Sequence, residues 1–280
     1  MGLMGMNVAL VIAAYNEQEI IGPLTQALIR ALDDLEGVTW RLIYVIEGTD
    51  STLCQAQGFA RERSEIEIIY NPDASGLGRA FSRGFDAVPS DADFVVTMDA
   101  DFNHQPEDIA GLIAAINETG ADIVVGSRRV AKSAVEGMPA WKSVLSRTVG
   151  WMLRRVMGVD VKDMTSGFRV YRAKVLRQLQ FSSTGFAFLP EILIKASFQK
   201  MKVVEKPIRF VYREAGESKM SFIPTGLSYM RLFTRYFALE YLPGARREVT
   251  ERFCTSRIER LEDRKDPSHA EDDLHKQSRS

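Results

Sequence analysis

Short apolar runs alternate with amphipathic segments over roughly the first 127 residues, and this alternation limits the possible folds more than any other feature. Each run has the length of a strand, and the segments between runs repeat apolar residues at helical spacing. Strands that alternate with helices form βαβ units around a mostly parallel sheet, so we predict an α/β fold. The expected strands are residues 8–13, 42–46, 66–70, 94–98 and 123–125. The expected helices are residues 17–32, a helix that follows the second strand and runs through residue 61, and residues 78–88 and 106–117.

Polar side chains follow four of the expected strands at the point where each strand ends. These polar groups occupy residues 15–17, 47–50, 71–73 and 99–101. In open α/β sheets, ligands bind beyond the carboxyl ends of the strands. The sequence therefore predicts a binding site along one edge of the sheet.

The most informative of these groups is the pair Asp99 and Asp101, separated only by Ala100. Like charges this close raise each other's pKa unless a cation neutralises them. Mg²⁺ or Mn²⁺ binds carboxylate oxygens and usually keeps room for substrate phosphates. The pair therefore suggests a site for a nucleotide diphosphate, although many such pairs are only solvated loop residues.

The second half of the chain is less regular. We expect a helix over residues 141–157, a strand over 167–172, a helix over 190–200, a strand over 203–213 that Pro207 interrupts, and an aromatic-rich segment over 226–242. We predict three parts: a globular domain (1–221), an amphipathic interfacial segment (222–244), and a charged helix with a disordered tail (245–280).

The bulk composition excludes several classes of protein. The chain has 280 residues, 45% hydrophobic and 26% charged, as in soluble globular proteins, and its net charge of −1 gives no reason to expect nucleic-acid binding. Cys54 and Cys254 are too few for a disulfide framework, which favours a reducing compartment. No signal peptide and no run of roughly 18 apolar residues is apparent, so we expect a cytoplasmic protein that is soluble or peripheral to a membrane.

Six motifs occur in a specific order between about residues 7 and 221. They are AYNE at 14–17, GLGRA at 76–80, MDADFNH at 98–104, GSR at 126–128, DMTSGFR at 163–169 and REAGESK at 213–219. With these motifs the chain resembles the family 2 glycosyltransferases, in particular the dolichyl- or polyprenyl-phosphate mannosyltransferase group. The resemblance implies a nucleotide-diphospho-sugar transferase (GT-A) fold and an inverting, metal-dependent transfer of a sugar, expected to be mannose from GDP-mannose, to a polyprenyl phosphate.

The resemblance also assigns the donor side of the site. Metal binding falls to Asp99, Asp101 and Asn103, with Mg²⁺ or Mn²⁺ as the cofactor. The family usually has two acids at the end of the second strand, but this chain has only Glu47 there, which leaves the identity of the base open. The residues assigned to the donor nucleotide are Ala14, Tyr15, Glu17, Glu47, Gly78, Asp99 and Ala100.

An anionic acceptor needs fixed cations, and arginine can bind phosphate through two nitrogens. The resemblance assigns the acceptor phosphate to Arg128, Lys142, Ser146 and Arg147, although the last three also fit a solvated basic helix face. It assigns catalytic roles to Asp101, Arg128, Arg213 and Lys219, and the last two flank a loop that could close as a lid. A phosphomonoester is already largely anionic near pH 7, so it needs no catalytic base.

Three alternatives remain open at this stage. The donor could be UDP-glucose or another nucleotide sugar, or the acceptor could be a non-lipid hydroxyl with Glu191 as its base, or the chain could be a silent binding module. For the lipid acceptor, we expect the protein to work at the cytoplasmic face of a membrane. It would reach the membrane through the aromatic segment or through a membrane partner subunit, although that segment could equally pack against the catalytic domain.

Overall fold

The computed structural model describes residues 5–137, 158–212 and 222–241, together with residues 144, 147, 148, 150–152, 154 and 155. Contacts divide the chain into two units, Met1–Leu232 and Phe233–Ser280. The architecture given below is that of the first unit. Among the described helices, none has both the length and the apolar composition needed to cross a membrane.

A seven-stranded sheet forms the centre of this unit, with the strand order β3-β2-β1-β4-β7-β5-β8. All neighbouring strands run parallel except β7, which is antiparallel to both β4 and β5. The predicted α/β fold is therefore confirmed. The strands are β1 (Met6–Tyr15), β2 (Val38–Glu47), β3 (Ile66–Asn71), β4 (Phe94–Asp99), β5 (Ile123–Ser127), β7 (Arg169–Arg172) and β8 (Val203–Pro207), and a second sheet pairs β6 (Ala134–Glu136) with β9 (Arg209–Val211).

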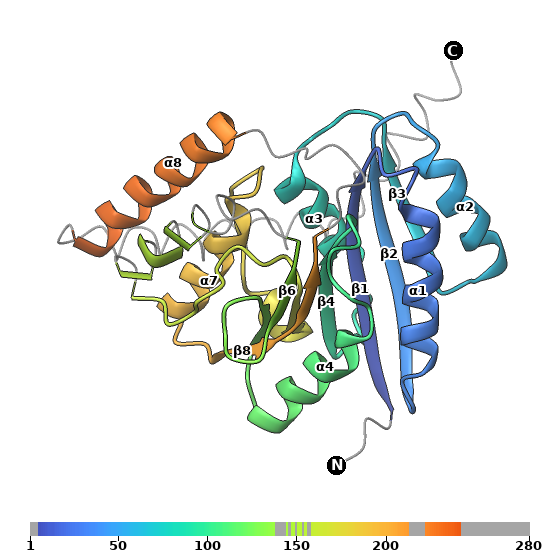
Figure 1. The fold of residues 1–280 in the computed structure, drawn as a ribbon, viewed down its shortest axis with the longest axis horizontal. Coiled ribbons are helices and arrows are strands. Elements are labelled where there is room, and N and C mark those ends of the chain that lie inside the picture. The colour runs from blue at the N-terminus through green and yellow to red at the C-terminus, as the bar shows by residue number, and fades with distance from the viewer. Residues whose placement is uncertain are drawn as a thin grey trace, which may run out of the picture. The chain divides into compact units, whose positions relative to one another are not determined.

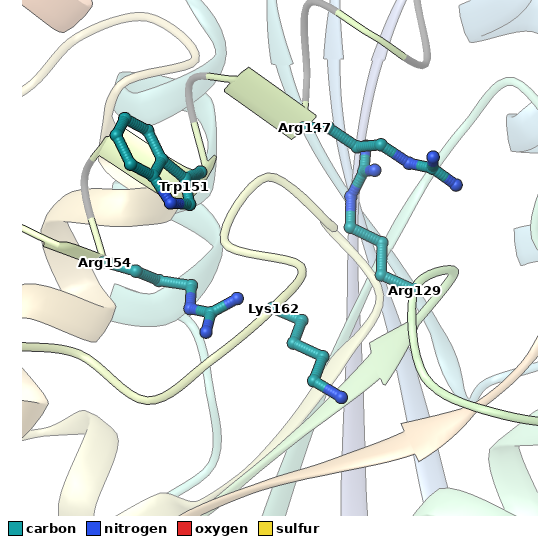
Figure 2. A pocket seen from close by; sticks show the side chains of 5 residues that line it. All are labelled: Arg129, Arg147, Trp151, Arg154 and Lys162. Atoms are coloured by element: carbon teal, nitrogen blue, oxygen red, sulfur yellow. The ribbon is translucent and has the colours of Figure 1, made fainter.

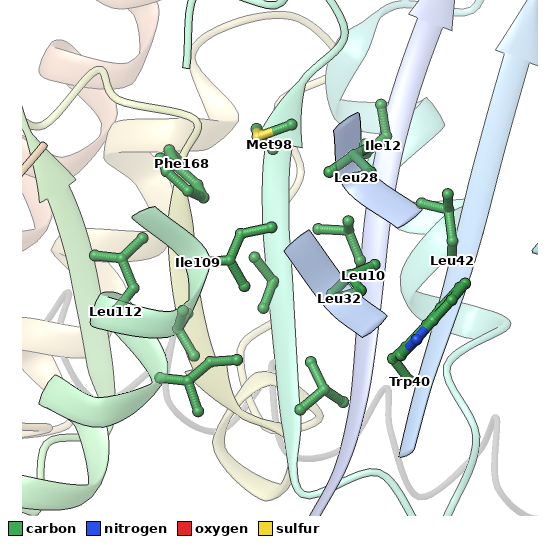
Figure 3. Packing of buried hydrophobic residues seen from close by; sticks show 14 of the residues in the cluster. Leu10, Ile12, Leu28, Leu32, Trp40, Leu42, Met98, Ile109, Leu112 and Phe168 are labelled. Atoms are coloured by element: carbon green, nitrogen blue, oxygen red, sulfur yellow. The ribbon is translucent and has the colours of Figure 1, made fainter. Parts of the chain in front are cut away.

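Helices cover both faces of the main sheet (Figure 1). Leu10, Ile12 and Leu42 lie in the same buried cluster as apolar residues of α1 and α4, as Figure 3 shows. On the other face, Gly84 of α3 contacts Val11 and Val45 so closely that a methyl group at residue 84 would overlap Val11. The helices are α1 (Ile21–Asp33), α2 (Thr52–Glu62), α3 (Leu77–Asp86), α4 (Asp108–Thr119), α6 (Ala173–Leu176), α7 (Phe188–Phe198) and α8 (Phe222–Tyr241).

The carboxyl ends of the first four strands lie side by side. Tyr15 pairs with Glu47, Glu47 pairs with Asn71, and Asp99 pairs with Ala13. The chain proceeds from β1 to β2 on one side, whereas β4 lies on the other side of β1. Such a reversal of strand order opens a crevice where ligands bind. The predicted edge of polar groups is confirmed.

Element boundaries differ from the expectations at several points. The first helix begins at Ile21 rather than near residue 17, because residues 17–20 form a turn in which the Ile20 N–H donates to the Glu17 carbonyl at 3.0 Å. The predicted strand over 203–213 is two strands in different sheets, which separate after Pro207. β6 and α6 were not anticipated, because three exposed residues and a single helical turn leave no periodic pattern. Most of the helix expected over 141–157 lies outside the described residues, and the part that is described is helical.

Candidate active site

Asp99 and Asp101 stand at the crevice between β1 and β4. Asp99 is the last residue of β4, and Asp101 follows in a tight turn in which Phe102 has a φ of 56°. Asn103 holds Asp101 in place, since its backbone N–H donates to Oδ1 at 3.0 Å and its side-chain amide donates to Oδ2 at 2.6 Å. The turn therefore fixes two carboxylates close together.

This arrangement makes the ionisation of both acids costly. Burial and the neighbouring Asp101 raise the pKa of Asp99 to about 7, although Arg128 and Arg169 oppose the rise. Burial also raises the pKa of Asp101, against the hydrogen bonds from Asn103. Two neighbouring acids whose pKa values are both raised form a site that a cation would stabilise.

His104 lies beside this pair and is almost completely buried, with 1% of its surface exposed. Its Nδ1 is 3.6 Å from Asp99 Oδ2, and neither ring nitrogen has a hydrogen-bond partner among the described residues. Burial and the charge of Arg128 lower the pKa of His104 to about 3, so the ring is neutral. Its ring packs between Phe168 and Phe210, which orients the nitrogens next to the acids.

These residues fit a hard divalent cation. The carboxylates of Asp99 and Asp101 are suitable ligands, and the amide oxygen of Asn103 lies on the same turn. In the part of the chain that the structure describes, no three His, Cys, Asp and Glu side chains are grouped to hold a metal by themselves. Mg²⁺ and Mn²⁺ commonly bind through one or two carboxylates and complete their shell with water and substrate phosphates.

Gly167 makes room for Asp99. A methyl group at this residue would overlap both carboxylate oxygens of Asp99, and the Gly167 carbonyl accepts a hydrogen bond from the Thr97 hydroxyl at 2.7 Å. The backbone just before β7 thus approaches β4 so closely that no side chain fits at residue 167. Glycine is required at residue 167 because of the acid that it faces.

Arg128 is held near the acids by Asp163, the first residue of the motif at 163–169, to which the sequence analysis gave no role. The guanidinium donates two hydrogen bonds to the Asp163 carboxylate, each 2.8 Å long, and the Arg128 backbone N–H adds a third at 2.9 Å. Arg128 holds the pKa of the buried Asp163 at about 2, despite burial. Asp163, Asp99 and Asp101 together keep the pKa of Arg128 raised although it is desolvated. Arg128 is thus a fixed cation beside the aspartate pair.

Two further residues near the acids were also missed. Arg169 is completely buried and donates to the carbonyls of Ser166 (2.8 Å), Leu189 (2.8 Å) and Met164 (2.9 Å), so its charge is held by backbone dipoles. Tyr229 on α8 lies near Arg128 and Arg169, and burial raises its pKa to about 12 against their charge. The motif at 163–169 contained Arg169, but no sequence signal pointed to Tyr229.

Among the residues expected to bind the donor nucleotide, Glu47 is buried, and its carboxylate accepts hydrogen bonds from Ser75 and Arg83. The Ser75 backbone N–H donates at 2.9 Å, the Ser75 hydroxyl donates as well, and Arg83 donates at 2.9 Å. Glu47 therefore fixes the loop that leads into α3. Tyr15 has 41% of its surface exposed at the end of β1, whereas Ala14 and Ala100 are buried.

Gly78 and Glu17 also make contacts within the protein. The Gly78 N–H donates to the Thr184 carbonyl at 2.8 Å, and a methyl group at residue 78 would overlap the Ser183 carbonyl oxygen. Close packing of the 183–184 loop thus explains the glycine, and its N–H is engaged in that contact. The Glu17 N–H donates to the Thr52 hydroxyl at 2.7 Å.

Glu191 holds the same loop from the other side. Its carboxylate accepts hydrogen bonds from the backbone N–H groups of Ser182 (3.0 Å) and Ser183 (2.8 Å), and it pairs with Lys195 at 3.0 Å. Burial opposes the ionisation of Glu191, but Lys195 and the hydrogen bonds from Ser183 outweigh it and lower the pKa of the acid. The acid is therefore an ionised, fully engaged anchor for the loop that packs on Gly78.

The remaining predicted residues fall into two groups. Lys142, Ser146, Arg213 and Lys219 lie outside the described residues. Arg147 is described and lines a pocket of about 250 Å³ with Arg129, Trp151, Arg154 and Lys162, shown in Figure 2.

Comparison with known proteins assigns the family. Residues 9–180 match the model of glycosyl transferase family 2. The chain is 33% identical to an undecaprenyl-phosphate mannosyltransferase of Micrococcus luteus, over 77% of this chain and 88% of that protein. It is 33% identical to a polyprenol monophosphomannose synthase of Mycolicibacterium smegmatis, over 75% of this chain and 80% of that protein. It is 36% identical to a dolichol-phosphate mannosyltransferase of Pyrococcus furiosus, over 77% of this chain and 59% of that protein.

Solved structures with the same fold include glucosyl-3-phosphoglycerate synthase from Mycobacterium tuberculosis. Its complex with Mn²⁺, UDP-glucose and glycerol 3-phosphate is 21% identical, with a TM-score of 0.60 over 84% of this chain and 80% of that chain. Its complex with Mg²⁺ and UDP is also 21% identical, with a TM-score of 0.61 over 84% of this chain and 79% of that chain. The expected GT-A fold is confirmed. The family model and the three relatives together show that the chain belongs to glycosyl transferase family 2, in the group of polyprenyl-phosphate mannosyltransferases.

Proposed function

We propose that this protein transfers a mannosyl group from GDP-mannose to a polyprenyl phosphate, with inversion at the anomeric carbon and with Mg²⁺ or Mn²⁺. The names of its relatives support the mannosyl group and the lipid phosphate. The single observation that carries the proposal is the crowded pair Asp99 and Asp101 at the crevice, with the fixed cation Arg128 beside it. One end of the site thus suits a metal-bound diphosphate and the other an anionic nucleophile.

The acids act on the donor. Asp99 and Asp101, with Asn103, would hold the divalent cation, and when bound this cation supplies Lewis-acid stabilisation of the departing diphosphate. Asn103 keeps the Asp101 carboxylate oriented, and Gly167 leaves the Asp99 carboxylate the space that it needs. Such positioning and electrostatic stabilisation are what this reaction requires of the protein.

Arg128 acts on the acceptor. Its pairing with Asp163 fixes the guanidinium, so that the charge is in place before the lipid phosphate arrives. We assign Lys142 and Ser146 to the same phosphate, and Arg213 and Lys219 to the closing of the site. Arg147 is not assigned to this phosphate, because it lines a separate pocket with Arg129, Trp151, Arg154 and Lys162. With a second pKa of about 6, the phosphate is already a nucleophile at neutral pH.

Glu191 separates this proposal from transfer to a hydroxyl acceptor. A hydroxyl needs a base, and removal of a general base typically costs about 10²–10⁴-fold in rate. Because Glu191 anchors the 182–183 loop through its charge, we expect Glu191→Gln to raise the KM for the donor and to lower kcat by less than about tenfold. The pH–rate profile should keep its shape. A kcat loss of about 1,000-fold with loss of the acidic limb would instead identify Glu191 as the base.

The metal assignment is tested with Asp101→Ala. We expect this variant to lose transfer and Mn²⁺ binding while it keeps the circular-dichroism spectrum of the native protein. Asp86→Ala, which removes an exposed acid on α3, is the matched control and should keep both activities. Near-normal turnover of Asp101→Ala would refute the assignment.

The donor and the membrane complete the proposal. A panel of GDP- and UDP-sugars tests the donor, with the lipid product identified by its mass.

We place the enzyme peripherally at the cytoplasmic face of a membrane, with residues 1–221 as the catalytic domain. Residues 222–244, or a membrane partner subunit, would form the contact to the bilayer.

A further inference from the structure

A second cluster of charge lies next to the aspartate site. Arg129, Arg147, Arg154 and Lys162 surround a pocket of about 250 Å³ together with Trp151, and we call this group the basic pocket. Figure 2 shows Arg129 extending toward Arg147, and Arg154 pointing its guanidinium toward Lys162. Residues from three separate stretches of the chain thus bring four cations together.

The acids near the basic pocket are largely engaged elsewhere. Asp163 is bound to Arg128 through two hydrogen bonds of 2.8 Å. The Glu205 carboxylate accepts hydrogen bonds from the backbone N–H groups of Lys162 (2.7 Å) and Asp163 (2.9 Å). Among the described residues, no carboxylate comes within 4 Å of the side-chain nitrogens of Arg147, Arg154 or Lys162.

The cations also repel one another. Burial lowers the pKa of Arg129, the charges of Arg128 and Arg147 lower it further, and Asp163 opposes them. An anion in the basic pocket would remove this repulsion. Because arginine binds phosphate through two nitrogens, a phosphate group suits the space and the charge.

The basic pocket and the aspartate pair have different charged neighbours. Arg128 interacts electrostatically with Asp99 and Asp101, whereas Arg129 interacts with Arg147 and with Arg128 itself. Asp163 contacts both arginines, at 2.8 Å from Arg128 and 3.8 Å from Arg129. The Arg128–Asp163 pair therefore links the basic pocket to the aspartates.

Two apolar side chains in the same helical stretch as Arg147 and Arg154 are exposed. Val144 is 61% exposed and Trp151 is 64% exposed. With Arg147 and Arg154 they follow a spacing of three and four residues, so they share one face of a helix. Exposed tryptophan beside arginine is typical of side chains that lie at the headgroup level of a bilayer.

We propose that the basic pocket binds the phosphate headgroup of an anionic phospholipid, with Trp151 inserted at the membrane interface. The inference rests on the proposed function, since a polyprenyl phosphate acceptor brings the enzyme to a bilayer. The bound headgroup would hold the catalytic crevice at the level of the acceptor's phosphate. It is a second phosphate, distinct from the acceptor's own.

The test is vesicle flotation of the full chain carrying Arg154→Gln and Lys162→Gln. The control carries Arg61→Gln and Lys174→Gln, which remove the same charge from exposed positions on α2 and α6. The vesicles contain phosphatidylcholine alone, with phosphatidylglycerol, or with polyprenyl phosphate. With phosphatidylglycerol, we expect affinity to fall roughly thirtyfold for the pocket variant, since each cation near an anionic surface contributes about 1 kcal/mol. The control should retain most of its affinity.

Two results would overturn the inference. One is phosphatidylglycerol binding by the pocket variant that equals that of the control. The other is a loss confined to polyprenyl phosphate vesicles, which would assign the basic pocket to the acceptor. Transfer by the unmodified protein to a short prenyl phosphate in neutral detergent micelles tests the proposed function separately, because no anionic phospholipid is present there.

Discussion

At the scale of single residues, ion pairs determine which charged side chains can act on a substrate. Asp163 holds the Arg128 guanidinium in one orientation through two hydrogen bonds of 2.8 Å. Glu191, in contrast, has its carboxylate committed to Ser182, Ser183 and Lys195. The sequence singled out Arg128 and Glu191 but could not predict the partners of either side chain, because those partners come from distant positions or from a neighbouring loop.

Replacement of Asp163 by Asn should be strongly destabilising. It leaves Arg128 without its buried counter-charge, and breaking a buried pair from one side costs about 3–5 kcal/mol. Urea unfolding measures this loss, with Asp86→Asn as the exposed control. The contribution of the Asp163–Arg128 pair to stability should also depend on pH. Because folding lowers the pKa of Asp163 from 3.8 to about 2, this contribution is fully present above pH 3.8 and is lost as the pH falls toward 2. A loss below about 1 kcal/mol at pH 7 would show that the pair is not important for stability.

Metal affinity should follow the ionisation of Asp99. Its pKa is about 7 in the protein without metal, so the carboxyl is mostly protonated below that pH and must lose its proton to bind a cation. We expect Mn²⁺ affinity to fall as the pH drops from 8 to 6, measured by calorimetry or Mn²⁺ electron paramagnetic resonance. An affinity that stays constant over this range would contradict the crowded, desolvated pair. The raised pKa of Asp99 also affects stability, but in the opposite direction to metal affinity. Because the folded protein holds the Asp99 proton more tightly than the unfolded chain does, the metal-free fold should lose stability as the pH rises from 3.8 to 7.

At the scale of elements, the antiparallel strand β7 shapes the site. It lies between β4 and β5, so its first residues reach the edge where the parallel strands end. This brings Gly167 against Asp99 and places Arg169 close enough to interact electrostatically with Asp99. Sequence patterning predicted a strand here, but alternation of apolar residues contains no information on strand direction.

Gly167→Ala tests this account of β7. The added methyl group overlaps the Asp99 carboxylate, and misplacement of a reacting group by about 1 Å can cost about 100-fold in rate. We expect transfer and Mn²⁺ affinity to fall together. Gly58→Ala on α2 is the control, because open space surrounds it and alanine favours a helix by about 0.5–1 kcal/mol. Normal metal binding by Gly167→Ala would show that β7 is not coupled to the acids.

At the scale of the whole molecule, the sequence was sufficient for the sheet and for the edge that carries the site. Each buried strand ends in polar residues, and the parallel arrangement aligns those ends, as with Tyr15, Glu47 and Asp99. Contacts between distant residues could not be predicted in this way. Asp163 and Arg128 are 35 positions apart, and the cations of the basic pocket come from three stretches, so no local pattern relates them. The net charge of −1 likewise conceals a strongly basic region.

One measurement tests the central claim most directly. The purified full chain is incubated with GDP-mannose, a short prenyl phosphate and Mn²⁺, and the lipid product is identified by mass spectrometry with and without a chelator. We predict a mannosyl phosphoprenol that disappears on chelation and returns when excess Mn²⁺ is added. Formation of the same product at an undiminished rate under full chelation would contradict a mechanism in which Asp99 and Asp101 hold a divalent cation.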